Sequence, residues 1–163
     1  MTVAVDKRAL VSQVVEALER ERDTLLAAHR ASAAGATHEE NRAEGDKDMR
    51  STEVSYLARG QALRVTELGE ELLRLAALQL RSFGPDEPIA ATAWVELRLS
   101  TGGLTVLLLP GGAGTRVSDA RGEARVITPA SPLGSALVGA RLGDVVEVER
   151  GGEAVEYEIV AVE

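Results

Sequence analysis

The stretch Ser82-Phe83-Gly84-Pro85-Asp86-Glu87-Pro88 divides the chain into two parts with different local chemistry. Proline ends a helix and biases the residue before it toward extended backbone. All five prolines and 12 of the 16 glycines follow Phe83. We therefore predict helices in residues 1–83 and strands joined by tight turns in residues 84–163.

On the N-terminal side, apolar residues recur at the three-, four- and seven-residue spacing of one helix face. One stripe contains Val11, Val14, Leu18 and Leu25, and the other contains Val54, Leu57, Val65, Leu68, Leu72 and Leu75. Neither stripe is wide enough for a helix that is buried all round, so each helix needs a partner. We predict an antiparallel helical hairpin (coiled coil) with arms Asp6–Ala34 and Asp48–Arg81, joined by an acidic tip loop at residues 35–48.

On the C-terminal side, apolar and polar residues alternate in short runs, which is typical of strands. The predicted strands are Trp94–Leu99, Leu104–Leu109, Glu123–Ile127, Val145–Glu149 and Val155–Val162, with one short helix at Pro132–Val138. We expect an α+β fold, a small antiparallel sheet carrying that helix, with Trp94 in its core. The glycine-rich run Pro110–Thr115 lacks the lysine of a phosphate-binding loop, so we interpret it as a flexible hairpin connection.

Composition excludes several classes of protein. The net charge is −8 and aromatic residues make up 2% of the chain, which disfavours direct binding to nucleic acid. Without cysteine there is no disulfide or thiolate zinc site, and two histidines cannot build a typical zinc site. No apolar run is long enough to span a membrane, and no signal-peptide core is visible, so we expect a cytoplasmic protein.

The predicted bend concentrates carboxylates at the end of a long arm. These are Glu39, Glu40, Glu44, Asp46 and Asp48. Clustered carboxylates can hold a divalent cation such as Mg²⁺ and help to position water for attack on a phosphodiester. The alternative is a solvated loop whose polar residues cap helices, because Thr37 and Glu40 have the spacing of a capping box.

Residues 126–148 resemble the C-terminal signature of the Gre transcript-cleavage factors. The matching elements are Ser131-Pro132-Leu133, then Ala136-Leu137 and Gly139, then Gly143-Asp144 followed by valines alternating with acids. The resemblance implies a coiled coil followed by an FKBP-like domain. In this family that domain docks on the rim of the RNA polymerase secondary channel, and the coiled coil enters the channel. The docking candidates are Ser131, Pro132, Ser135 and Asp144.

The resemblance also implies a role for the tip. Tip acids of these factors help the polymerase active site to bind a second Mg²⁺ and hydrolyse backtracked RNA, so such a chain is an accessory factor and not itself an enzyme. Two registers match the family tip, one through Glu40-Asn41 and one through Gly45-Asp46. We prefer the second because it leaves arms of similar length.

In that register, Asp46 and Asp48 are the candidate Mg²⁺ ligands, and Glu44 and Glu40 are candidate assisting acids. Lys47 stands between the two aspartates, which departs from the family pattern. Two functions follow: stimulation of transcript cleavage, or regulation from the secondary channel without cleavage. A third interpretation is an interaction module for another partner. We expect a monomer with RNA polymerase as its partner, without strong nucleic-acid binding of its own and without membrane binding.

Overall fold

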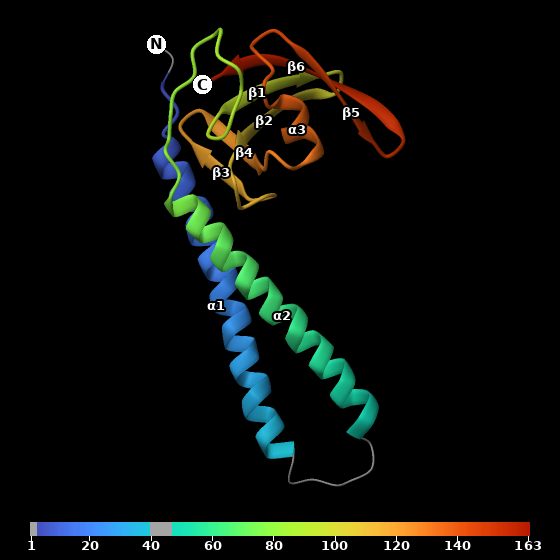
Figure 1. The fold of residues 1–163 in the computed structure, drawn as a ribbon. Helices are drawn as coiled ribbons and strands as arrows, with labels where there is room; N and C mark the ends of the chain where they lie inside the picture. Colours follow the sequence, from blue (N-terminus) through green and yellow to red (C-terminus); the bar gives the residue numbers. More distant parts are fainter. Residues whose placement is uncertain (1–2, 40–46) are drawn as a thin grey trace.

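The computed structural model describes the backbone at residues 3–39 and 47–163, and the side chains at residues 3–32 and 55–163. Two long helices, α1 (Lys7–Glu39) and α2 (Lys47–Ala76), form an antiparallel hairpin. A β domain follows, which consists of six strands and one short helix, α3 (Pro132–Leu137). The hairpin projects away from this domain (Figure 1). The predicted fold class is therefore confirmed.

The helix ends differ from those predicted. The side chain of Asp6 caps α1 by accepting a hydrogen bond from Ala9 N at 3.0 Å. The backbone of α1 continues past Ala34 to Glu39, while α2 stops at Ala76, before the predicted end at Arg81. Beyond Ala76 the chain leaves the helix, and this allows Leu78 and Phe83 to pack into two different apolar clusters. The domain boundary that we predicted after Phe83 lies in this connecting segment and stays a prediction.

The sheet has the order β3-β4-β2-β1-β6-β5. The strands are β1 (Trp94–Leu99), β2 (Gly102–Leu108), β3 (Arg116–Asp119), β4 (Gly122–Ile127), β5 (Val145–Arg150) and β6 (Glu153–Val162). All pairs are antiparallel except β2 with β4, which is parallel. The sequence analysis did not predict β3 or the parallel pair. Because β3 pairs with β4 and not with β2, the run Pro110–Thr115 does not close a hairpin, and that interpretation was wrong.

Two apolar cores lie on opposite faces of the sheet. The hairpin core joins the helices to one face and contains Leu10, Val14, Leu18, Leu68, Leu75, Trp94, Leu107, Leu109, Val117, Ala124 and Val126. The α3 core on the other face includes Phe83, Ile89, Val95, Leu97, Val106, Leu108, Leu137, Tyr157 and Ile159. Trp94 is buried as predicted, but in the core that the sheet shares with the helices.

Helix α3 (Pro132–Leu137) is held against the sheet by a close backbone contact. Ser131 caps it, accepting from Gly134 N at 3.1 Å and donating to Thr128 O at 2.7 Å. A Cβ atom at Gly134 would lie 2.0 Å from that same Thr128 oxygen. The helix can therefore pack this closely against Thr128 only with a glycine at position 134, because the backbone atoms of Thr128 cannot move aside as a flexible side chain can.

We predict that Gly134→Ala lowers the free energy of unfolding by on the order of 3 kcal/mol, measured by urea denaturation. Gly69→Ala is the matched control, because a Cβ atom at Gly69 in α2 meets nothing within 4 Å. It should be neutral or stabilise by up to about 1 kcal/mol. Equal effects of the two substitutions would contradict this description of α3.

Candidate functional site

The far end of the hairpin is the first candidate site. Glu39 ends α1 and Lys47 begins α2 at the end of the hairpin remote from the β domain (Figure 1). The candidate acids Glu40, Glu44 and Asp46 lie outside the described residues. Asp48 belongs to the first turn of α2 by its backbone, but its side chain also lies outside them. The metal-ligand prediction therefore stays a prediction.

The chemistry of this donor set suits Mg²⁺, because hard divalent cations prefer carboxylate oxygens. Elsewhere, the part of the chain with described side chains contains no group of three or more acidic or histidine residues that could hold a metal ion. None of the described helices is long and apolar enough to cross a membrane.

The two helices pack tightly at one end. They lie together beside the sheet and separate toward the far end (Figure 1). Among described side chains, Leu10, Val14 and Leu18 of α1 and Leu68 and Leu75 of α2 are the apolar residues buried in the hairpin. Further out, Leu57 of the predicted stripe is 68% exposed, so this part of the coiled-coil prediction was wrong. The helices have separated there, and Leu57 and Leu25 of α1 line an open hollow between them instead of packing closely.

The predicted docking residues surround α3. Pro132 and Ser135 are exposed on the helix, and Ser131 is half-buried because it caps the helix. Asp144 is exposed in the turn before β5, where its carboxylate accepts from Arg141 N at 2.8 Å. The structure thus places all four on or beside the segment that runs from α3 to β5.

Three exposed apolar residues in this segment were not predicted as functional. They are Val138 (45% exposed), Leu142 (42%) and Val145 (58%). The sequence contains a signal for the last of these. Val145 and Val146 are successive residues of a strand, so they point to opposite faces and only one of them can face the core. Exposed apolar side chains beside polar ones are typical of a surface that binds another protein.

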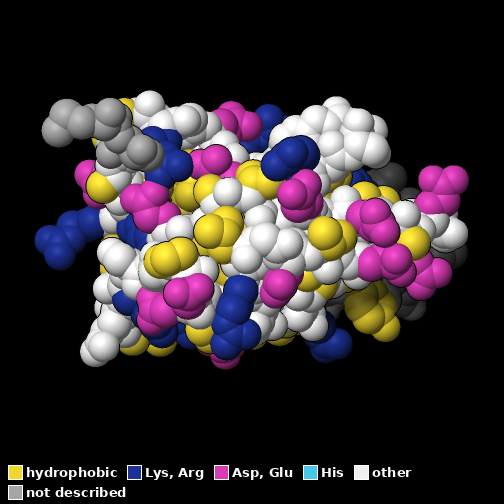
Figure 2. All heavy atoms as spheres, turned by 90° about the horizontal axis from the view of Figure 1, so that it is seen from above, with side chains coloured by type: hydrophobic (Ala, Val, Ile, Leu, Met, Phe, Trp, Pro, Cys, Tyr) yellow, Lys and Arg dark blue, Asp and Glu magenta, His cyan; other side chains and the backbone are white. Residues whose placement is uncertain are grey.

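The hairpin of β5 and β6 carries an acidic surface. Glu147 lies opposite Glu156 in the strand register, and Val145 lies opposite Glu158. Figure 2 shows acidic side chains gathered at the end of the domain where these two strands lie. Like charges placed directly opposite each other destabilise a strand pair. This surface would also repel the phosphates of nucleic acid.

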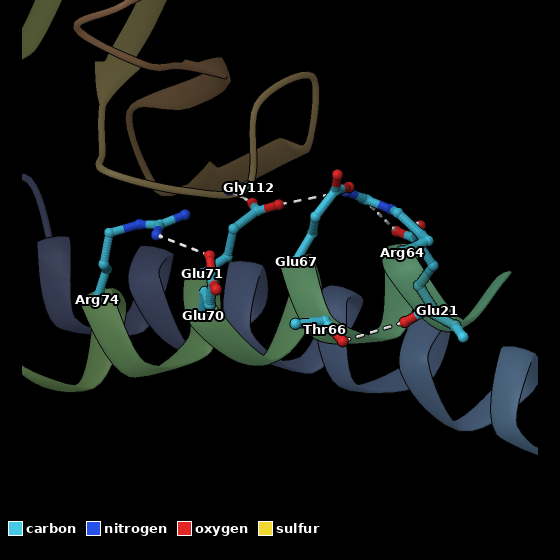
Figure 3. Close-up of polar contacts among 9 residues, drawn as sticks. Glu21, Arg64, Thr66, Glu67, Glu70, Glu71, Arg74 and Gly112 are labelled. Carbon is cyan, nitrogen blue, oxygen red and sulfur yellow. Dashed lines mark hydrogen bonds and ion pairs between the residues drawn. The ribbon is translucent and has the colours of Figure 1, made fainter. Parts of the chain in front are cut away.

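Polar contacts at the base of the hairpin fix it to the β domain. Glu71 of α2 accepts a hydrogen bond from the backbone N–H of Gly112 at 2.6 Å. Its other oxygen accepts from Arg64 at 3.3 Å, and Arg64 binds Glu21 of α1 at 2.8 Å (Figure 3). The hydrogen bond to Glu21 raises the pKa of Arg64 above its ordinary value. One chain of contacts therefore links α1, α2 and the loop between β2 and β3.

Lys7 occupies a buried position at the same end of the molecule. Only 8% of the residue is exposed, and its Nζ donates to Arg81 O at 2.6 Å. The ammonium group also lies 5.0 Å from the centroid of the Phe83 ring. Burial lowers the pKa of Lys7 to about 8, although Glu163 partly opposes this effect. Lys7 thus ties the start of α1 to the segment that enters the β domain.

A second ion-pair group holds the C-terminal residue. Arg121 contacts the carboxylates of Glu163 and Glu96, the latter at 2.6 Å. Glu163 also accepts from Val5 N at 2.8 Å, and Trp94 Nε1 donates to Glu96 at 3.3 Å. These bonds join the segment before α1 to the sheet. The contacts hold separate segments of the fold together, and we assign them to its stability.

The β domain defines a class of protein. Residues 86–163 match the family model of the transcription elongation factors GreA/GreB, C-terminal domain. The class is thus that of a helical hairpin attached to a Gre-type C-terminal domain. The C-terminal domain of this chain is thus of the Gre type, as the sequence resemblance indicated.

Several solved structures are similar over nearly the full chain. The transcription factor Gfh1 is 26% identical, with 95% of this chain and 94% of that chain covered and a TM-score of 0.40. GreA factor homolog 1 (Gfh1) of Thermus thermophilus is 21% identical, with 95% of both chains covered and a TM-score of 0.39. Gfh1 of Thermus aquaticus is 22% identical, with 96% of this chain and 95% of that chain covered and a TM-score of 0.40. No curated protein matches the sequence.

The buried amine of Lys7 leads to a pH prediction. Between pH 8 and the ordinary lysine pKa of 10.5, the unfolded chain keeps a proton that the folded chain has released. The free energy of unfolding should therefore rise with pH in this window. Relative to Lys7→Met, the wild type should gain on the order of 2 kcal/mol between pH 8 and pH 10 in urea denaturation. A constant or falling difference would contradict the burial of this amine.

Proposed function

We propose that this protein is an accessory transcription factor that binds RNA polymerase. Its β domain binds the rim of the secondary channel, and its hairpin enters the channel. The match of residues 86–163 to the GreA/GreB C-terminal domain carries the proposal. The hairpin supports it as well, because α1 has 33 residues and is about 50 Å long, and its far end projects beyond the domain.

The tip then carries the chemistry. Asp46 and Asp48 would hold Mg²⁺ together with the polymerase active site, and Glu44 and Glu40 would assist them. The bound ion would supply charge stabilisation and help to activate water. The chain's own contribution is to bring carboxylates to a reaction centre that belongs to the polymerase, so that backtracked RNA is cleaved and the stalled complex is released. We expect the factor to act as a monomer in the cytoplasm.

One observation favours a second candidate function, regulation from the channel without cleavage. Lys47 lies between the two candidate ligands in the sequence. A lysine ammonium beside paired carboxylates competes with a cation for them. In this alternative the hairpin occupies the channel, and the tip excludes other factors or substrates instead of contributing to hydrolysis.

The surface around α3 is the proposed contact with the polymerase. It comprises the predicted residues Ser131, Pro132, Ser135 and Asp144 together with the exposed apolar side chains of Val138 and Leu142. The apolar side chains give the free energy of binding through burial, and the polar ones at the rim set orientation. Leu133 and Leu137 face the α3 core and are not part of this surface.

The tip and the docking surface can be tested in one experiment with backtracked complexes, Mg²⁺ and labelled RNA. Asp46→Asn combined with Asp48→Asn should reduce factor-dependent RNA shortening about 100-fold and leave binding unchanged, because the metal contributes several kcal/mol. Pro132→Glu and Val138→Glu should instead weaken binding about tenfold or more. Glu16→Gln combined with Glu19→Gln, two exposed acids of α1, is the control matched for the loss of two charges.

The outcomes separate the candidates. Shortening by the wild type but not by the double tip variant supports cleavage. Binding without shortening, combined with altered initiation or elongation, supports the regulatory alternative. If the wild type does not bind the polymerase, both are wrong, and the interaction-module interpretation replaces them.

A further inference from the structure

The loop Pro110–Thr115 lies between the helical hairpin and the sheet and is bonded to both. Toward the sheet, Leu109 N and Gly114 N donate to Ile127 O and Val126 O at 3.0 and 2.9 Å, and Thr115 O accepts from Val126 N at 2.8 Å. Toward the hairpin, Gly112 N donates to Glu71, and Pro110 O accepts from Arg74 at 3.1 Å. The loop thus connects α2 to the sheet through hydrogen bonds on both sides.

Two glycines bring this loop into direct contact with the helices. A Cβ atom at Gly112 would lie 2.2 Å from Cγ1 of Val14 in α1, and one at Gly111 would lie 3.0 Å from Cβ of Glu71 in α2. Gly112 also has a φ of +78°, in the left-handed region that favours glycine. Both glycines are buried. The loop backbone therefore occupies the groove between the two helices with no room for a side chain.

Further bonds fix the rotation of the hairpin. Gln13 of α1 donates to Ser118 O at 2.8 Å and accepts from Ser118 N at 3.0 Å. The side-chain amide of Gln13 thus pairs with the backbone of the edge strand β3, as a neighbouring strand would. Glu71 is more buried than its partner Arg64, with 16% of its side chain exposed against 38%. A contact on α1 and a contact on α2, on two different segments of the β domain, restrict both tilt and rotation of the hairpin.

The length of the hairpin makes this restraint important. A tilt of about 10° at the base would move the end of α1, about 38 Å from the contact at Val14, by roughly 7 Å. Chemistry at a reaction centre is sensitive to displacements of about 1 Å. A hairpin that delivers its tip to a distant site therefore needs a stiff base, and an apolar core alone allows sliding more readily than directed hydrogen bonds do.

We propose that the contact of the Pro110–Thr115 loop with Val14 and Glu71 sets the direction of the hairpin. Glu71, Gln13 and Gly112 are then positioning residues, which act on the tip through the orientation of α1 and α2 and do not touch RNA or metal. The consequence for transcription rests on the proposed function, whereas the orientation itself is a property of the free protein and can be measured without polymerase.

The test uses the absence of cysteine from the natural sequence. Spin labels on Arg30→Cys in α1 and Glu149→Cys in β5, both exposed positions, report the distance between hairpin and β domain in the intact chain. The parent should give one narrow distance distribution. Gly112→Ala should shift or broaden this distance distribution. Adding Val14→Ala should bring the distribution part of the way back to that of the parent, because it removes the atom that the new Cβ would meet.

Glu71 provides a second variant that introduces no clash. Glu71→Ala should broaden the same distribution, and Glu71→Gln, which keeps an acceptor for Gly112 N, should stay close to the parent. With polymerase, Glu71→Ala should leave the half-saturating concentration within about twofold and lower the maximal effect on transcription several-fold. Circular dichroism checks that each variant retains its helices.

Unchanged narrow distributions in both Glu71→Ala and Gly112→Ala would overturn the proposal, whatever the transcription assay shows. If the distributions broaden as expected and the wild type has no effect on polymerase, the positioning role stands and the proposed function fails. If Gly112→Ala does not fold, the comparison of Glu71→Ala with Glu71→Gln decides alone.

Discussion

The packing of the helical hairpin against one face of the sheet is the interaction on which the rest of the molecule depends. Strand β2 makes this possible, because Leu107 faces the hairpin core while Val106 and Leu108 face the α3 core. A strand with apolar residues on both faces needs cover on both. The hairpin supplies one cover and α3 the other, so the domain is complete only with the base of the hairpin in place.

The base and the outer part of the hairpin therefore differ in how they are stabilised. The base of the hairpin is buried and bonded to the β domain, and beyond Leu18 the described part of α1 contributes no fully buried side chain. The outer part thus relies on helix continuity and on partly buried side chains such as Leu25. Helix α3 and the exposed Val138 at its end lie on the opposite face of the sheet from the hairpin core, so a partner bound there leaves the hairpin free to project.

The sequence predicted most of the fold because its local signals agreed with the tertiary structure. Both long helices, α3 and five of the six strands were predicted within a few residues. Strand β3 was missed because it has four residues, of which Val117 alone is buried. The end of α2 at Ala76 was missed because the next residues favour helix, whereas packing of Leu78 and Phe83 into the cores requires the chain to leave it.

The functional residues were harder to predict from the sequence than the fold. The acids of the tip could be named from charge and resemblance, but their geometry lies outside the described residues. Glu71 gave no signal, because glutamates spaced along a helix with arginines are typical of a solvated face. Its role depends on Gly112, which is 41 residues away in the chain. The run Leu107-Leu108-Leu109 did contain a clue, since three successive apolar residues indicate a strand covered on both faces.

The position of the hairpin in a complex with RNA polymerase, determined by electron cryo-microscopy, tests the central claim most directly. We predict density for α1 and α2 inside the secondary channel, with the ends of both helices near the catalytic metal and α3 against the channel rim. A complex in which the β domain is bound but the hairpin lies outside the channel would contradict it.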